Sequence, residues 1–302
     1  GIYVFTLLLY ARPNDLFPGL LGEFPLAKIV AIIAPLAYFS RQISSGEPLV
    51  RWTLEIKMVL LISLLGVLWM PAAASPKDSM DTLTDPFLKA VTIFVLMVNV
   101  INTRERLCSL WKLVIISGTV LATFAIRSYL SGQFTMRGLR IEGLVNGMFG
   151  NPNDLAAALD MLLPFAVVLG LMNKGKARIF YLVCAFVMAF GIIATFSRGG
   201  FLGLLATGGV LLWKLGRGQR FKTIFTTVFI LGILLAATPG GYGSRLSSIF
   251  DNNKDKTGSA QERRQLMERA FEVFMRRPVV GVGMGNFHIY SIREKEAHNA
   301  YL

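Results

Sequence analysis

Residues 178–213 read RIFYLVCAFVMAFGIIATFSRGGFLGLLATGGVLLW, and this stretch decides the fold. It holds two apolar runs, 178–196 and 199–213, with only a short turn at Arg198 between them. An apolar run of about 20 residues is long enough to cross a bilayer as an α-helix. Because almost no loop separates these runs, we expect two membrane helices joined by a tight turn that presents an arginine at the membrane boundary.

The same apolar character extends over most of the chain. Hydrophobic residues make up 54% and charged residues 16%, whereas soluble domains carry about 25% charged residues. The other apolar runs cover 1–10, 24–39, 56–74, 86–101, 110–128, 153–172 and 222–238. We therefore predict an all-α polytopic membrane protein, with about nine transmembrane helices over 1–238 and a partly helical external loop over 239–302. Because the chain starts without Met and stops in a polar segment, we expect both of its ends to be incomplete.

Lysine and arginine are unevenly divided between the connections. The richer set comprises 40–57, 103–112, 173–178 and 214–222. The poorer set comprises 11–23, 72–86, 127–151 and the turn at Arg198. Positive residues favour the cytoplasmic side of a membrane. We therefore expect Arg198 and the loop after residue 238 to lie on the outer side.

The charged and metal-ligating residues exclude several classes of partner. The net charge of +13 suits anionic lipid headgroups, and the basic residues are scattered among short loops, so we expect no nucleic acid. Cys108 and Cys184 lie in or beside apolar runs and show no metal or disulfide spacing. Because no His/Cys/Asp cluster has metal-ligand spacing, we expect neither a metal nor another cofactor.

The polar segment 259–302 opens with a helix signal. Ser259 and Glu262 have the capping-box spacing, apolar residues follow at helical spacing, and Pro278 ends the run. At about 100° per residue, Arg263 falls within the apolar stripe and not on the charged face. A guanidinium on a face that packs against the protein needs an anionic partner. Arg263 is therefore a candidate anion-binding residue.

Each arginine also has a simpler interpretation. Arg198 can extend to the lipid headgroups instead of forming an anion site. Arg263 can form a salt bridge, with Glu262, Asp154 and Asp160 as candidate partners. Arg264 is more typical of a solvated face.

One of the two histidines is a candidate catalytic base. His298 precedes an apolar turn that we expect to dock on the membrane bundle. An imidazole with a pKa near the usual value of about 6.5 suits proton removal at neutral pH. His288 is the competitor, but its aromatic neighbours Phe287 and Tyr290 favour a packing role.

Residues 150–154 read GNPND and end in polar side chains ahead of the sixth apolar run. Pro152 and its neighbours are typical of a helix start, and the alternative is a polar rim in which Asn153 contacts a sugar. Asp160 follows about two turns further into the membrane. A carboxylate there is costly without a partner, and we expect Arg198 or Arg127 to pair with it.

In combination, these stretches resemble the bacterial O-antigen ligase/Wzy polymerase family. The motifs are FSRGG at 196–200, Arg263 ahead of Pro278, PVVGVGMGNF at 278–287, HNAYL at 298–302 and GNPNDLA at 150–156. The resemblance covers about 150–302, and residues 1–149 match only as hydrophobic helices. Met267 stands where such families commonly have Trp, and the closing transmembrane helices of the family are missing from this chain.

The resemblance implies a GT-C-like membrane glycosyltransferase of a bacterial inner membrane, acting in polysaccharide or lipopolysaccharide biosynthesis at the periplasmic side. Such enzymes take a glycan from undecaprenyl pyrophosphate and pass it to a hydroxyl of lipid A core, of a growing polysaccharide or of a protein. Arg198 and Arg263 match the pyrophosphate-binding arginines of the family, and His298 matches its catalytic histidine. Asn153 and Arg264 are further candidates for substrate binding.

This assignment agrees with the chemistry of the residues. Two guanidinium groups can hold pyrophosphate bidentately without a metal, and His298 can remove the proton of the acceptor. A single displacement of this kind inverts the anomeric centre. The alternative function is a transporter or flippase for an anionic lipid-linked glycan, with Arg198 and Asp160 in its pathway, although no internal repeat of the kind found in transporters is evident.

Overall fold

The computed structural model describes residues 1–11, 26–132, 149–215, 232 and 259–291. Within these ranges every regular element is helical and no strand occurs, which confirms the all-α prediction for the described part of the chain. The chain divides into two compact units. The first unit is Gly1–Ile32 with Thr103–Phe250, and the second unit is Ile33–Asn102 with Asp251–Leu302.

Five helices among the described residues are long and apolar enough to cross a membrane. They are Leu26–Ser45 (α4), Pro76–Val100 (α6, η2 and α7), Arg104–Leu130 (α8), Pro152–Met172 (α9) and Gly175–Ala194 (α10). Each contains most of a predicted apolar run, which confirms a membrane protein with several spans. Three further predicted runs form the shorter helices Ile2–Ala11 (α1), Leu54–Leu68 (α5) and Arg198–Leu215 (α11). The last run, 222–238, lies outside the described residues except for Gly232.

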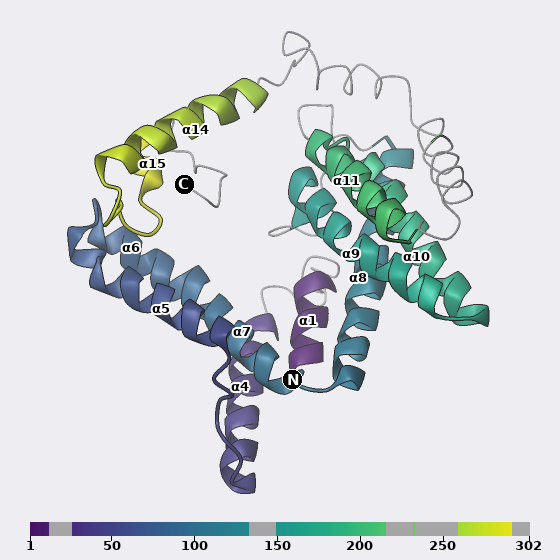
Figure 1. Cartoon of the computed structure of the whole chain (residues 1–302), viewed down its shortest axis with the longest axis horizontal. Coiled ribbons are helices and arrows are strands. Elements are labelled where there is room, and N and C mark those ends of the chain that lie inside the picture. The colour runs from purple at the N-terminus through teal and green to yellow at the C-terminus, as the bar shows by residue number, and fades with distance from the viewer. Residues whose placement is uncertain (12–25, 133–148, 216–231, 233–258, 292–302) are drawn as a thin grey trace. The chain divides into compact units, whose positions relative to one another are not determined.

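The first unit is a bundle of α8, α9, α10 and α11, with α1 packed against α8 (Figure 1). Its core holds fully buried side chains such as Ile115, Leu159 and Met188. Lipid tails are as apolar as these side chains, so close van der Waals contact holds membrane helices together. Small residues permit that contact: a Cβ added at Gly191 would lie 2.7 Å from the Cβ of Ala122. Helix α11 packs against α9 and α10 of this closely packed bundle.

The second unit is built on α5 and on the span that follows it. A 3-10 turn, Met70–Ala72 (η1), leads from α5 towards α6, Pro76–Thr82, which Ser75 caps through a 3.3 Å hydrogen bond from the backbone N of Asp78. The span continues through a π-helical turn, Leu83–Phe87 (η2), into α7, Leu88–Val100. Pro86 within this turn has no N–H to donate, and the wider turn accommodates the missing hydrogen bond.

Part of the predicted external loop docks on the connection between α5 and α6. It contains α14, Ser259–Arg276, and α15, Phe287–Tyr290, so the predicted helix after Ser259 is confirmed. Between them, the backbone N of Ala74 donates to the carbonyl of Val282 (2.9 Å), and Arg277 Nη1 donates to that of Ala72 (3.3 Å). The polar segment therefore shares a compact unit with helices of 33–102.

Candidate functional site

The turn between α10 and α11 is held by a chain of short polar contacts. Thr195 Oγ1 donates to the carbonyl of Ile192 (2.6 Å) and accepts from the backbone N of Ser197 (3.2 Å). Ser197 Oγ then accepts from the backbone N of Gly200 (3.2 Å), which caps the first turn of α11. These bonds are buried, so the turn is fixed from inside and α11 begins at Arg198.

The residue before the cap has an unusual backbone. Phe196 has φ +56°, in the left-handed region that a bulky side chain rarely adopts. Its ring is buried and packs on Tyr129 of α8, with 5.8 Å between the ring centroids. Strained backbone persists where the surrounding structure over-determines it, and such positions cluster at functional sites. The packing of Phe196 therefore fixes the direction in which the chain turns into α11.

The start of α11 lies beside the start of α9. Ser197 Oγ donates to Asn153 Oδ1 across 2.9 Å, and the next contacts along the two helices involve Ala156 with Gly200 and Asp160 with Gly203. A Cβ added at Gly200 would lie 2.5 Å from that of Ala156. The glycines thus let the two helices run close together. The GNPND and FSRGG segments therefore meet at the same end of the bundle.

This arrangement gathers positive electrostatic potential around Arg198. The N-terminal end of a helix carries a partial positive charge and binds anions, and the N-terminal ends of α9 and α11 meet here. Arg198 adds a full positive charge in the first turn of α11, where a cation is disfavoured by the helix dipole. Its side chain is partly exposed. An anion bound at this end would offset the partial positive charges of the two helix ends and the full positive charge of Arg198.

The prediction that Asp160 pairs with Arg198 or Arg127 is wrong. Among the described residues, neither Arg198 nor Arg127 forms a hydrogen bond or ion pair with this carboxylate, and Asp160 Oδ1 is buried without a hydrogen-bond partner. The carboxylate instead faces Gly203, where an added Cβ would collide with it. Asp160 thus contacts a glycine of α11 and not the arginine that opens this helix.

The two candidate arginines on α14 belong to the second unit. By its helical angle Arg263 falls within the apolar stripe of α14, but its side chain is exposed, so the expectation that it points into a packed interface is wrong. Within the described residues it makes no side-chain hydrogen bond and no ion pair. Arg264 Nε, in contrast, donates to Glu268 Oε1 across 2.9 Å, and both side chains are well exposed.

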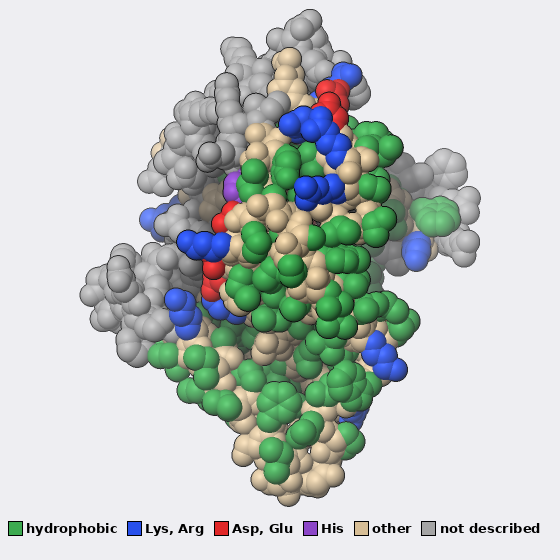
Figure 2. All heavy atoms as spheres, turned by 90° about the vertical axis from the view of Figure 1, so that its left-hand side faces the viewer, with side chains coloured by type: hydrophobic (Ala, Val, Ile, Leu, Met, Phe, Trp, Pro, Cys, Tyr) green, Lys and Arg blue, Asp and Glu red, His purple; other side chains and the backbone are tan. Residues whose placement is uncertain are grey.

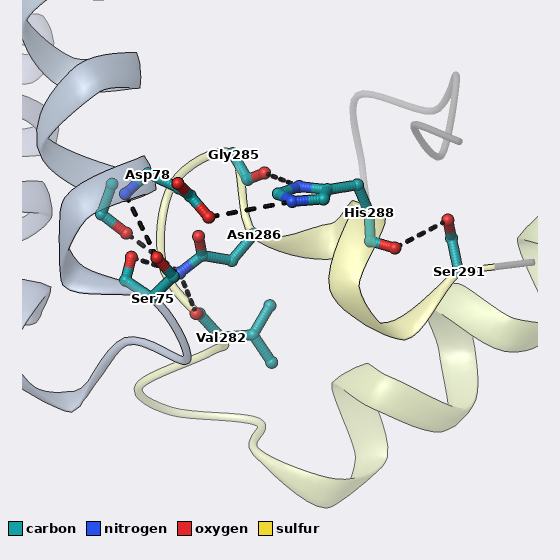
Figure 3. Close-up of polar contacts among 8 residues, drawn as sticks. Ser75, Asp78, Val282, Gly285, Asn286, His288 and Ser291 are labelled. Carbon is teal, nitrogen blue, oxygen red and sulfur yellow. Dashed lines mark hydrogen bonds and ion pairs between the residues drawn. The ribbon is translucent and has the colours of Figure 1, made fainter. Parts of the chain in front are cut away.

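The structure describes one of the two histidines. His288 Nδ1 donates to the carbonyl of Gly285 (2.7 Å), and its Nε2 lies 3.8 Å from Asp78 Oδ2 (Figure 3). Both ring nitrogens thus face polar groups of its own unit. His298, the predicted base, lies outside the described residues.

The sequence interpretation missed a docking element next to His288. Asn286 is fully buried, and its Nδ2 lies within hydrogen-bond distance of Ser79 Oγ (3.1 Å) and of the carbonyls of Ser75 (3.1 Å) and Val282 (2.9 Å) (Figure 3). The alternating glycines that precede it, at 281, 283 and 285, all have positive φ. The alternating glycines were the sequence signal that could have indicated this docking element, because glycine is the residue that adopts positive φ readily.

The structure therefore brings together some of the predicted residues. Asn153 lies beside Ser197 and so next to Arg198 in the first unit, whereas Arg263 and Arg264 share α14 in the second. In the described part of the chain, no three His, Cys, Asp or Glu side chains are grouped to hold a metal ion.

These helices define a polytopic membrane protein with a polar segment that carries exposed cations. Residues 183–302 match the family model described as O-antigen ligase. No curated protein and no solved structure matches the chain. Over residues 183–302 the chain is thus similar to the O-antigen ligase family, and this similarity implies a membrane glycosyltransferase acting on lipid-linked glycans. The matched range includes Arg198, Arg263, Arg264 and His298.

Proposed function

We propose that the protein transfers a glycan from undecaprenyl pyrophosphate to an acceptor hydroxyl. The observation that carries this proposal is the family match, which extends over Arg198, Arg263 and His298 in a single stretch. The acceptor is lipid A core, a growing polysaccharide or a protein. We place the protein in a bacterial inner membrane as a GT-C-like bundle of about nine spans, with its active site facing the periplasm.

Arg198 is proposed to bind the pyrophosphate of the donor. Its guanidinium follows a buried turn and opens α11 beside the N-terminal end of α9, an environment that favours negative charge. A planar guanidinium can bind two phosphate oxygens at once. Asn153 is a secondary contact: its Oδ1 accepts from Ser197, and its amide NH2 can donate to the glycan.

Arg263 is proposed as the second cation on the pyrophosphate. Its exposed guanidinium has no anionic partner in the described part of the chain, so binding an anion would break no existing ion pair. Arg264 is a weaker secondary contact because it is already paired with Glu268. Two arginines would offset the charge that develops on the leaving group, which is the main electrostatic task of such a site.

His298 is proposed as the general base of an inverting displacement. The acceptor oxygen attacks the anomeric carbon as the bond from that carbon to the pyrophosphate oxygen breaks. The bonding electron pair leaves with the pyrophosphate, and the acceptor proton passes to the imidazole. No metal or other cofactor is needed when the leaving group is already stabilised by two guanidinium groups.

The test is a transfer assay in membrane vesicles supplied with lipid-linked donor and candidate acceptors. His298→Ala and Arg198→Ala should abolish formation of the new glycosidic bond while the protein stays folded in the membrane. His288→Ala and Lys214→Ala are the matched controls, because His288 contacts only its own unit and Lys214 lies in the last turn of α11. A normal glycan product from the His298→Ala protein would contradict the proposal.

One observation favours a second candidate function, a transporter or flippase for an anionic lipid-linked glycan. Asp160 lies within a candidate span, and its Oδ1 is buried without a partner. Ionisable groups inside a membrane often mark a transport pathway. The same vesicles discriminate the two functions, because a transporter moves the donor to the opposite leaflet and forms no new bond. Loss of such movement in Asp160→Asn, with no transfer in the wild type, would support the second function.

A further inference from the structure

Helix α14 carries more apolar surface than its own unit covers. Leu266, Ala270 and Val273 are buried and form the face that packs on the second unit. A neighbouring set of apolar side chains is exposed: Met267 (49%), Phe271 (55%), Phe274 (44%) and Met275 (61%). At the helical angle per residue these four fall in one continuous sector of about 100°. We call them the exposed apolar face.

Outside the buried face and the exposed apolar face, α14 carries polar side chains. Gln265, Glu268 and Glu272 form a polar sector that begins beside Met275, and all three are exposed. Two bulky aromatic residues on a sector open to solvent would be costly in water and mark an interaction surface. A helix with one apolar and one charged face is suited to lie in the interface of a bilayer.

Two arginines precede the exposed apolar face along the helix. Arg263 and Arg264 lie one turn before Met267, whereas Arg276 lies about 100° round the helix from Met275, in the polar sector. Arginine side chains can lay their methylene groups along apolar surface and extend the guanidinium to phosphate groups. This charge distribution complements a phospholipid surface better than it complements a second apolar protein surface.

The contacts of residues 277–286 place the C-terminal end of α14 at a membrane boundary. Arg277 and Val282 are hydrogen-bonded to Ala72 and Ala74, which connect α5 to the candidate span that begins at Pro76. Figure 1 shows α14 leaving this end of α5 and α6 in a different direction from those helices. The C-terminal end of α14 therefore lies at the level at which the span that begins at Pro76 leaves the bilayer. The helix does not continue along the direction of that span.

The exposed apolar face is continuous with other apolar surface of the second unit. Phe274 also lines a groove of about 460 Å³, together with Leu65 and Trp69 of the α5 end. Trp is favoured at membrane–water interfaces. In Figure 2, hydrophobic side chains cover much of this side of the molecule, and several Lys and Arg side chains gather in its upper part.

We propose that α14 lies in the interfacial layer of the bilayer at this end of the span. The exposed apolar face rests on the acyl chains of anionic phospholipids, and the two arginines that precede it bind their phosphate groups. A consequence that rests on the proposed function is that Arg263 sits at headgroup depth, where the pyrophosphate of a lipid-linked donor also lies. The seating of α14 itself is measured without reference to transfer.

The test uses the full chain in nanodiscs of phosphatidylethanolamine and phosphatidylglycerol. Cys108 and Cys184 are replaced by Ser, and a spin label is attached at Phe271→Cys or, as the matched control, at Gln265→Cys on the polar face of the same helix. We expect the label at Phe271→Cys to collide several-fold more with lipid-soluble oxygen than with an aqueous nickel complex. The control label should show the reverse.

Two results would overturn the proposal. Equal access of the nickel complex to both labels would place the exposed apolar face in water, and protection of the Phe271→Cys label from both reagents would mean that protein covers it. Photo-crosslinking of the unmodified protein provides a second test that needs no substitution. A phospholipid with a diazirine near the carbonyl end of its acyl chain, at the depth of the interfacial layer, should label 259–276, and absence of that labelling would also contradict the proposal. If the protein is labelled by the lipid but shows no transfer, the proposed function is contradicted and the proposed position of α14 still holds.

Discussion

The two regions that carry the candidate cations support them in opposite ways. Arg198 follows a turn whose polar groups are buried and hydrogen-bonded, on a helix packed closely against α9. Arg263 projects from α14, where it is exposed and has no ion pair in the described part of the chain. The backbone that carries the Arg198 guanidinium is thus held in place by buried hydrogen bonds. The Arg263 guanidinium, in contrast, is exposed and can adapt its position.

This difference has a mechanistic meaning if both arginines bind one pyrophosphate. A rigid cation sets the position of the anion, because a preorganised charge costs no reorganisation during reaction. An exposed cation on a surface helix can follow the substrate as it binds. Substitutions near Arg198 should therefore be costly, and those around Arg263 should be tolerated.

The largest expected effect is that of Arg198→Lys on transfer. Lysine keeps the charge but loses the planar fork that binds two phosphate oxygens, and the fixed turn leaves little room to compensate. We expect a loss on the order of 100-fold in transfer rate, or about 3 kcal/mol of transition-state stabilisation. Arg263→Lys should cost several-fold less. Equal losses measured in the vesicle assay would refute the contrast between a rigid and an adaptable cation.

Gly200→Leu should separate α11 from α9. The first side-chain atom would already lie 2.5 Å from the Cβ of Ala156, and overpacking of this kind costs about 1–3 kcal/mol. We expect lower thermal stability in detergent and a loss of transfer of at least about tenfold. Gly209→Leu is the control on the same helix, because no atom lies within 4 Å of an added Cβ there. Wild-type behaviour of both variants would show that the close contact is dispensable.

Asn286→Ala should loosen the docking of 277–286 on the α5–α6 connection. The substitution removes the buried amide that lies within hydrogen-bond distance of Ser79 Oγ and of the carbonyls of Ser75 and Val282, and the loss of each such hydrogen bond costs about 0.5–1.5 kcal/mol. Limited proteolysis should then cut near α14 faster than in the wild type. Ser291→Ala, which removes a single bond to the carbonyl of His288, should change the cleavage rate much less; similar rates in both would exclude Asn286 as the docking residue.

The hydrogen bond between Ser197 and Asn153 should show a smaller coupling. In a double-mutant cycle of Ser197→Ala and Asn153→Ala, we expect an interaction free energy of about 1 kcal/mol. Ser197→Ala alone should be more harmful than Asn153→Ala, because it also removes the cap on Gly200 N. Thermal unfolding in detergent measures both effects, and strict additivity would mean that the bond contributes nothing.

The smallest effect should come from Arg264→Ala. Its ion pair with Glu268 is exposed, and exposed pairs of this kind are worth about 0.2–1 kcal/mol. Stability should hardly change, and transfer should fall only slightly if Arg264 is a secondary contact to the glycan. A loss as large as that of Arg263→Ala in the vesicle assay would instead make Arg264 a principal ligand of the pyrophosphate.

Local sequence signals predicted which segments are helical and where several of them end. Five of the apolar runs lie mostly within the candidate spans, and the polar helix runs from Ser259 to Arg276, just ahead of Pro278. These features depend on composition, spacing and the missing N–H of proline, all of which a short stretch of sequence contains. Arg263 was located on the correct part of α14 for the same reason, although the prediction that it would be buried was wrong.

By itself, the sequence determined a helical membrane protein, the positions of its apolar runs and the family motifs of its C-terminal part. Only the tertiary structure decided that Asn153 accepts from Ser197, that Asp160 faces Gly203 and that Asn286 fastens 277–286 to the α5–α6 connection. The physical reason is that each of these contacts joins residues distant in the chain. Helical periodicity specifies the face on which a side chain lies, but the packing of the folded helices selects the group that it meets.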